Sequence, residues 1–383
     1  MSKVMHKLIH RLFPGIFLVS PAVLAVPLAV HSLPVTALAA NSSEVRIAQA
    51  EAATELPKVK ILTTGGTIAS RGATPLTLSD YTAGRVQGNA LVEAVPEIQN
   101  FANVEVEEIA NIGSPNMTGE IWLQMANRIN EIFATEPDVA GVVITHGTNT
   151  LEETSFFLHL TVKSDKPVVL VGAQRPATAI SADGPLNLIN AVRVAAAPQS
   201  RGMGTLLVMN DQINSARDVT KTNTFRLETF QSGELGFLGY ADSDRVVYYR
   251  APMRRHTVQS EFDITNITEL PRVDIVYSYA EAPRETVDVL VEAGAKGIIL
   301  AGTGAGGAAP REFEGLQEAV QNGVAVIASS RVGNGRVLDR QRYNDAGIIP
   351  GDNLLPQKAR ILLMLALTQT SDPAEIRRIF EEY

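Results

Sequence analysis

The chain contains no cysteine, and this absence removes several kinds of chemistry at once. Without thiols there are no disulfides, zinc–thiolate sites, iron–sulfur clusters or cysteine nucleophiles. Positive charge is also scarce, because the chain has 33 lysines and arginines against 41 aspartates and glutamates, which gives a formal net charge of -8 at pH 7. Binding to nucleic acid or to an anionic membrane surface needs a basic patch, so neither is an expected partner.

Other catalytic signatures are missing as well. The six histidines show no clustered spacing, and there is no His-Glu-x-x-His helix, so no metal ion is expected. The sequence also lacks a Ser-His-Asp pattern and a Gly-x-Ser-x-Gly elbow. Threonine hydroxyls remain as the most numerous candidate groups for catalysis.

The N-terminus has the pattern of a secretory signal peptide. A basic start is followed by an apolar run over residues 12–30 and by small residues that allow cleavage after Ala39. An uncleaved membrane anchor is the alternative, but three prolines interrupt the run, at positions 14, 21 and 27. We therefore predict a signal peptide over 1–39 and a periplasmic or secreted protein with no membrane attachment after cleavage.

The rest of the chain predicts two α/β domains. A length of 383 residues with 45% hydrophobic residues suits about two domains. After a disordered lead over 40–56, short apolar runs alternate with segments of helical periodicity. This alternation predicts a parallel or mixed sheet with helices on both faces. The expected parts are a large N-terminal domain (57–250), a charged connection (251–271) and a smaller C-terminal domain (272–383).

Specific elements follow from the same patterns. Strands are predicted at 58–62, 141–145, 167–172, 204–209, 273–277, 297–300 and 325–328. Helices are predicted at 89–98, 119–134, 186–197, 286–293, 311–321, 356–367 and 373–382. Ligands of such sheets bind at the carboxyl ends of the strands, so the loops that follow the strands are the places where a site is expected.

The first such loop is Thr63–Ser70, which contains the pair Gly65-Gly66. Adjacent glycines allow a sharp turn and a close approach of backbone to a ligand. The spacing matches neither of the common phosphate-binding loops. The hydroxyls that crowd this turn, including Thr67, suggest hydroxyl chemistry or hydrogen bonding, but spacing alone favours a plain structural turn.

Three further loops carry polar side chains. In Thr145–Thr154, Thr150 and Glu153 predict a capping box, and the helix start also suits a carboxylate or an oxyanion. We interpret His146 in this loop as structural. The third loop, 181–187, is a turn with a proline near a helix start. The fourth, 216–222, contains Lys221, which by spacing alone is an ordinary lysine.

Together, these loops resemble the bacterial L-asparaginase family, in particular its exported type II branch. Thr-Thr-Gly-Gly-Thr-Ile-Ala-Ser at 63–70 and Thr-His-Gly-Thr-Asn-Thr-Leu-Glu-Glu-Thr at 145–154 resemble the two signature loops. Segments 171–176, 181–187, 218–224 and 356–360 are similar to family segments in the same order. The resemblance covers about 58–383.

The resemblance implies a cofactor-free, metal-free amidohydrolase that converts L-asparagine to L-aspartate and ammonia, often with activity on L-glutamine. It implies a homotetramer whose active sites lie between subunits. In the implied acyl-enzyme route Thr67 is the nucleophile, Tyr81 on a mobile flap is its hydroxyl partner, and Thr148 works with Lys221. The implied substrate-binding residues are Ser114, which holds the α-carboxylate, Asn149, Gly66 and Gly147.

Four positions depart from the family pattern. Asn149 replaces an aspartate that faces the substrate ammonium, and Pro115 replaces a glutamine or glutamate. Gly307 stands where a neighbouring subunit usually offers Asn or Ser, and 332–349 lacks the usual glutamate, with Asp339 as the nearest carboxylate. These changes predict retained amide hydrolysis with weaker or altered substrate affinity. The alternatives are an amidase of the same fold that prefers L-glutamine or another small amide, and a catalytically weak, exported binding protein for acidic amino acids.

Overall fold

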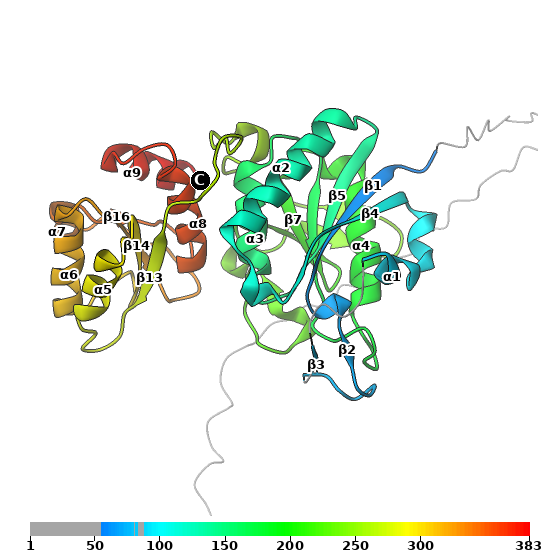
Figure 1. The fold of residues 1–383 in the computed structure, drawn as a ribbon, viewed down its shortest axis with the longest axis horizontal. Helices are drawn as coiled ribbons and strands as arrows, with labels where there is room; N and C mark the ends of the chain where they lie inside the picture. The colour runs from blue at the N-terminus through cyan, green and yellow to red at the C-terminus, as the bar shows by residue number, and fades with distance from the viewer. Residues whose placement is uncertain (1–54, 80, 83–87) are drawn as a thin grey trace, which may run out of the picture. The chain divides into compact units, whose positions relative to one another are not determined.

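The computed structural model describes residues 55–79, 81–82 and 88–383 of the chain (Figure 1). The predicted signal peptide (1–39) and all but the last two residues of the predicted lead (40–56) lie outside the described residues. The proposed domain limits at 57–250, 251–271 and 272–383 stay a prediction. Two sheets, one of eight strands and one of four, and the helices that cover them form the framework of the described chain.

Within the described chain the larger sheet has eight strands, in the order β12-β11-β8-β7-β6-β5-β1-β4 (Figure 1). Five neighbouring strands, β4, β1, β5, β6 and β7, run parallel to one another. Strands β8, β11 and β12 extend the sheet, each antiparallel to its neighbour. Central strands buried on both faces are continuously apolar, as the sequence of β5 to β7 is. The strands are β1 (Lys58–Gly65), β4 (Asn103–Ile112), β5 (Val139–Thr145), β6 (Val168–Val171), β7 (Thr205–Met209), β8 (Gln212–Ser215), β11 (Gly239–Ala241) and β12 (Val246–Tyr248).

Helices cover both faces of this sheet. On one face, α2 (Gly119–Thr135) and α3 (Leu151–Thr161) bury side chains such as Met125 and Phe156. On the other face, α1 (Gly88–Glu93) and α4 (Gly184–Ala196) bury a separate apolar cluster. The start of α2 is fixed by Thr118, whose hydroxyl accepts the Ile121 N–H at 3.3 Å and so satisfies one free donor of the helix.

The smaller sheet is parallel, in the order β13-β14-β15-β16. Helices α5 and α6 cover one of its faces, and α8 packs against β13 and β14 on the other (Figure 1). Buried side chains of α8 and α3 belong to the same apolar cluster. The elements are β13 (Val273–Tyr277), α5 (Glu285–Glu292), β14 (Gly297–Gly302), α6 (Pro310–Gln321), β15 (Ala325–Ser330), α7 (Gln341–Asp345), β16 (Ile349–Pro350), α8 (Pro356–Ala366) and α9 (Pro373–Glu382).

The predicted fold class, a large and a small α/β part, is confirmed, but one predicted helix is wrong in extent. The helix expected over 89–98 ends at Glu93, and a separate 3₁₀ helix covers Pro96–Asn100. Pro96 has no N–H to donate and excludes the preceding residue from the helical region. Val95 accordingly has φ -134° and ψ 66°, which breaks the helix.

Candidate active site

The glycine turn after β1 brings two loops into backbone contact. Gly66 has φ 84°, a conformation that disfavours any residue with a Cβ. A Cβ at this position would lie 2.3 Å from the Cα of Gly147, in the loop after β5. The two signature loops therefore meet at the carboxyl edge of the sheet, with Thr67 and Thr148 next to the point of contact.

Thr67 lies beside a tyrosine. Its Oγ1 is 3.0 Å from the hydroxyl oxygen of Tyr81, and either group can be the donor. Tyr81 belongs to β3 (Tyr81–Thr82), which pairs antiparallel with β2 (Arg71–Gly72) beyond the glycine turn. The Thr67 side chain is half-buried, so it is open to a substrate as well as to its partner.

Thr148 lies beside a lysine. The Lys221 ammonium donates to the Oγ1 of Thr148 at 2.8 Å and makes a longer contact of 3.4 Å with the Asn149 side-chain oxygen. Lys221 ends β9 (Thr220–Lys221), which pairs with β10 (Phe230–Gln231). Burial lowers the pKa of Lys221 below its ordinary value, and the nearby Glu152 carboxylate opposes that shift. A lysine in this setting is better able to release a proton than a fully solvated one.

Ser114 joins the second loop from the segment after β4. The hydroxyl of this buried residue accepts the Asn149 N–H at 3.1 Å. Its backbone carbonyl accepts the hydroxyl of Thr150 at 2.8 Å. The predicted capping box of Thr150 and Glu153 is therefore wrong, because the Thr150 hydroxyl is used to hold Ser114 and makes no side-chain cap on α3.

Most predicted site residues thus form two groups that meet through Gly66 and Gly147. Of the other departures from the family pattern, Pro115 directly follows Ser114 in a short 3₁₀ helix (Ser114–Asn116), and the remaining two lie in the C-terminal part of the chain. Gly307 exchanges two backbone hydrogen bonds with Thr303 in the loop after β14. Asp339 forms an ion pair with Arg377 of the same chain, with 2.6 Å between the guanidinium nitrogen and the carboxylate oxygen.

His146 has the structural role that we predicted. It is fully buried, and its two ring nitrogens lie 2.7 Å from the Gly147 carbonyl and 2.9 Å from the Thr154 hydroxyl. The carbonyl can only accept, so the first nitrogen carries the proton. Burial lowers the pKa of this histidine to about 4, which keeps the ring neutral at ordinary pH.

Two polar contacts around Lys221 were not expected from the sequence. Glu152 Oε1 accepts the Lys221 backbone N–H at 3.4 Å, and Glu152 Oε2 accepts the side-chain amide of Gln357 at 3.1 Å. Lys358, next to Gln357 on α8, is fully buried against residues 216–219. The sequence contained one indication that Lys358 is buried, because Ile361, Leu362 and Leu365 follow it at helical spacing and so place it on the apolar face of the helix.

Metal ligands do not gather at this site. In the parts of the chain that the structure describes, no group of three or more His, Asp or Glu residues is placed to hold a metal ion. Among those same residues, no helix combines the length and the apolar character needed to cross a bilayer.

The two sheets, with polar side chains gathered at the edge of the larger one, define an α/β enzyme with a large and a small part. The chain belongs to the type II asparaginase family: residues 58–254 match the model "Asparaginase, N-terminal", and residues 272–380 match the model "Glutaminase/Asparaginase C-terminal domain". The two family models match in the order that the sequence predicted.

Individual relatives agree with this assignment. L-asparaginase 2 of Bacillus subtilis is 49% identical over 344 residues, which are 90% of this chain and 91% of the relative. The glutaminase-asparaginase of Pseudomonas fluorescens is 44% identical over 94% of this chain and 98% of its own length. The crystal structure of a probable cytoplasmic L-asparaginase from Campylobacter jejuni superimposes with a TM-score of 0.83 at 46% identity, covering 85% of this chain and 99% of the other.

Proposed function

We propose that the protein is an L-asparaginase that hydrolyses the side-chain amide of L-asparagine with Thr67 as the nucleophile. The observation that carries the proposal is the meeting of two pairs of side chains at one edge of the sheet, one hydroxyl–hydroxyl and one ammonium–hydroxyl. Thr67 lies 3.0 Å from Tyr81, Lys221 lies 2.8 Å from Thr148, and Gly66 and Gly147 bring the two pairs together. Membership of the asparaginase family supports the same reaction.

The reaction proceeds in two balanced steps. The Thr67 oxygen attacks the amide carbonyl carbon, an ester forms, the C–N bond breaks, and the hydroxyl proton leaves with the nitrogen as ammonia. Water then cleaves the ester, which releases L-aspartate and restores the Thr67 hydroxyl. Tyr81 is positioned to pass the Thr67 proton on, and Lys221 can take a proton through Thr148. Backbone N–H groups near Thr148 supply the oxyanion contacts, each of which is worth about 2.7–4 kcal/mol in comparable enzymes.

The substrate's amino-acid end lies against Ser114 and Asn149 in this proposal. The Ser114 oxygen accepts the Asn149 N–H, so its own proton is available for the α-carboxylate. Asn149 offers a neutral oxygen to the α-ammonium, where an aspartate would offer a charge-assisted hydrogen bond. Gly66 and Gly147 allow the backbone to approach the ligand closely.

We also propose self-association as a homotetramer and export to the periplasm or medium. The outward side chains of β13 and the residues that follow support a contact with another copy, because Ile275, Tyr277 and Tyr279 are exposed, Tyr277 at 59%. The basic and apolar N-terminal pattern supports export. A Haemophilus influenzae relative, 47% identical, is named as a probable periplasmic L-asparaginase.

A panel of amides tests the proposed substrate. Full-length enzyme should release ammonia and L-aspartate from L-asparagine with a higher kcat/KM than from L-glutamine or an asparagine-containing dipeptide. A higher kcat/KM for one of the other amides would replace the proposal with the alternative amidase. Stoichiometric binding of L-aspartate without ammonia release from any amide would instead indicate a binding protein.

The substitution Asn149→Asp should lower the KM for L-asparagine by about fivefold. A hydrogen bond with a charged partner stabilises binding by about 1 kcal/mol more than a neutral one, and 1.4 kcal/mol corresponds to a factor of ten. The new carboxylate, close to the Lys221 ammonium, should also raise the pKa of Lys221. Steady-state kinetics measures both effects, and Asn266→Asp on the exposed connection is the charge-matched control. An unchanged KM would refute the assigned role of Asn149.

A further inference from the structure

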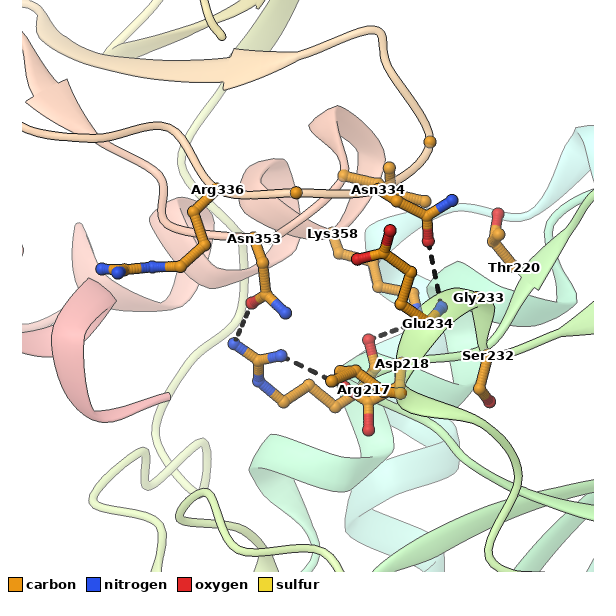
Figure 2. Close-up of a pocket in the computed structure, with 14 residues that line it drawn as sticks. Arg217, Asp218, Thr220, Ser232, Gly233, Glu234, Asn334, Arg336, Asn353 and Lys358 are labelled. Carbon is orange, nitrogen blue, oxygen red and sulfur yellow. Dashed lines mark hydrogen bonds and ion pairs between the residues drawn. The ribbon is translucent and has the colours of Figure 1, made fainter. Parts of the chain in front are cut away.

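Lys358 of α8 is the most deeply buried lysine that the structure describes, and it holds the segment that leads to Lys221. Only 1% of its surface is accessible. Its ammonium donates to the backbone carbonyl of Ala216 at 2.6 Å, of Arg217 at 2.8 Å and of Val219 at 2.5 Å. A lysine ammonium has three protons, so these carbonyls use its full donor capacity. Figure 2 shows the side chain running toward the segment that carries Asp218 and Thr220.

Burial disfavours the charged form of this lysine, but not enough to remove its charge at neutral pH. Burial lowers the pKa of Lys358 to about 8, while the Glu152 and Asp218 carboxylates raise it and Arg217 lowers it. The ammonium also lies 5.7 Å from the centre of the Phe156 ring, an arrangement that stabilises a cation. At neutral pH the group is therefore an ammonium bound to three carbonyls. Removal of the ammonium would leave three buried backbone carbonyls without a donor. Buried polar groups without a partner cost free energy.

A second contact from the same helix supports Lys221 through Glu152. Gln357 donates to Glu152 Oε2 at 3.1 Å, and Glu152 Oε1 accepts the Lys221 backbone N–H at 3.4 Å. Lys358 thus fixes the residues that precede Lys221, and Gln357 supports Lys221 itself through Glu152. Both contacts come from a helix that packs on the smaller sheet, whereas Lys221 belongs to the part of the chain that forms the larger one.

From this geometry we infer that Lys358 is a positioning residue for catalysis. It fixes the position of the Lys221 ammonium relative to the Thr148 hydroxyl. It does not touch the proposed reacting atoms, and its effect passes through the backbone of residues 216–221. The inference depends on the proposed function, because it concerns the hydroxyl–lysine pair of that reaction. A displacement of a reacting group by about 1 Å can lower a rate by about 10²-fold, so this indirect role has a measurable effect.

The substitution Lys358→Met tests the inference. We expect kcat for L-asparagine to fall by about 10- to 100-fold while KM stays within about twofold, because the contact between Ser114 and Asn149 does not involve residues 216–221. Lys163→Met is the matched control. Its ammonium also donates to a backbone carbonyl, that of Ser260 at 2.6 Å, but in the connection away from Lys221. This control should keep the parental kcat.

A double-mutant cycle separates positioning from general stability. If Lys358 acts through Lys221, then Lys358→Met should lower kcat little in an enzyme that already carries Lys221→Met. An equal loss of kcat in both backgrounds would refute the inference, as would a parental kcat in the single variant. If Lys358→Met does not fold, Gln357→Leu replaces it in the same cycle, because half-buried Gln357 supports Lys221 through Glu152 from the same helix. We expect Gln357→Leu to lower kcat about threefold in the parent and not in Lys221→Met, and an equal loss in both would refute the inference. An inactive parent enzyme would count against the proposed function, and an active parent with an unaffected Lys358→Met would count only against this inference.

Discussion

Alanine at position 67 should lower the turnover of L-asparagine by at least about 10³-fold, with a much smaller change in KM. The substitution removes the only oxygen at this position that can form the ester intermediate. The proposed contacts with the substrate's α-carboxylate and α-ammonium come from Ser114 and Asn149, which lie in other loops and stay in place. Ammonia release under saturating substrate measures the effect.

Two further variants make this prediction specific. Thr67→Ser keeps a hydroxyl near Tyr81 and should retain kcat within about tenfold of the parent. Thr265→Ala removes a threonine hydroxyl in the connection, where it bonds to Asp263, and should leave kcat unchanged. Retained binding of L-aspartate would show that Thr67→Ala is folded. Turnover by Thr67→Ala within tenfold of the parental value would refute the proposed nucleophile.

The layout of the fold was accessible from the sequence because its central strands and long helices have strong local patterns. Strands such as β5 and β7 are uninterrupted apolar runs, and α2 has an apolar face together with a threonine cap. The short strands β8, β11 and β12 were not predicted, since three or four residues carry too little periodicity. The helix over 89–98 failed because a single proline, Pro96, outweighed the apolar spacing around it.

The candidate site was accessible in part for a related reason. Loops that follow parallel strands share one edge, so Thr67 and Thr148 could be expected near each other without knowledge of the contacts. The contacts themselves depend on tertiary structure. Thr150 reads locally as a capping residue, yet its hydroxyl bonds to the carbonyl of Ser114, 36 residues away. Lys358 reads as a misplaced charge on an apolar helix until residues 216–219 are seen around it.

Methionine at position 221 should lower kcat by about 10²- to 10⁴-fold, the usual contribution of a positioned acid or base. The substitution keeps a long side chain but removes the amine that lies 2.8 Å from the Thr148 hydroxyl. Lys221→Arg should be nearly as inactive, because a guanidinium can donate to Thr148 but does not release a proton in this pH range. Lys166→Met is the control, since that ammonium donates to the Pro137 carbonyl outside the site.

The pH dependence of kcat distinguishes a base from a structural lysine. A base acts in its neutral form, so kcat should rise with pH as Lys221 loses its proton. Burial lowers the pKa of Lys221 from its ordinary value, which moves this rise to lower pH than a solvated lysine would give. The rise should be absent in Lys221→Met and displaced to higher pH in Asn149→Asp, where the added carboxylate favours the ammonium. The same rise in both Lys221→Met and the parent would exclude Lys221 as the group that titrates, and a kcat within threefold of the parent would exclude it from the reaction.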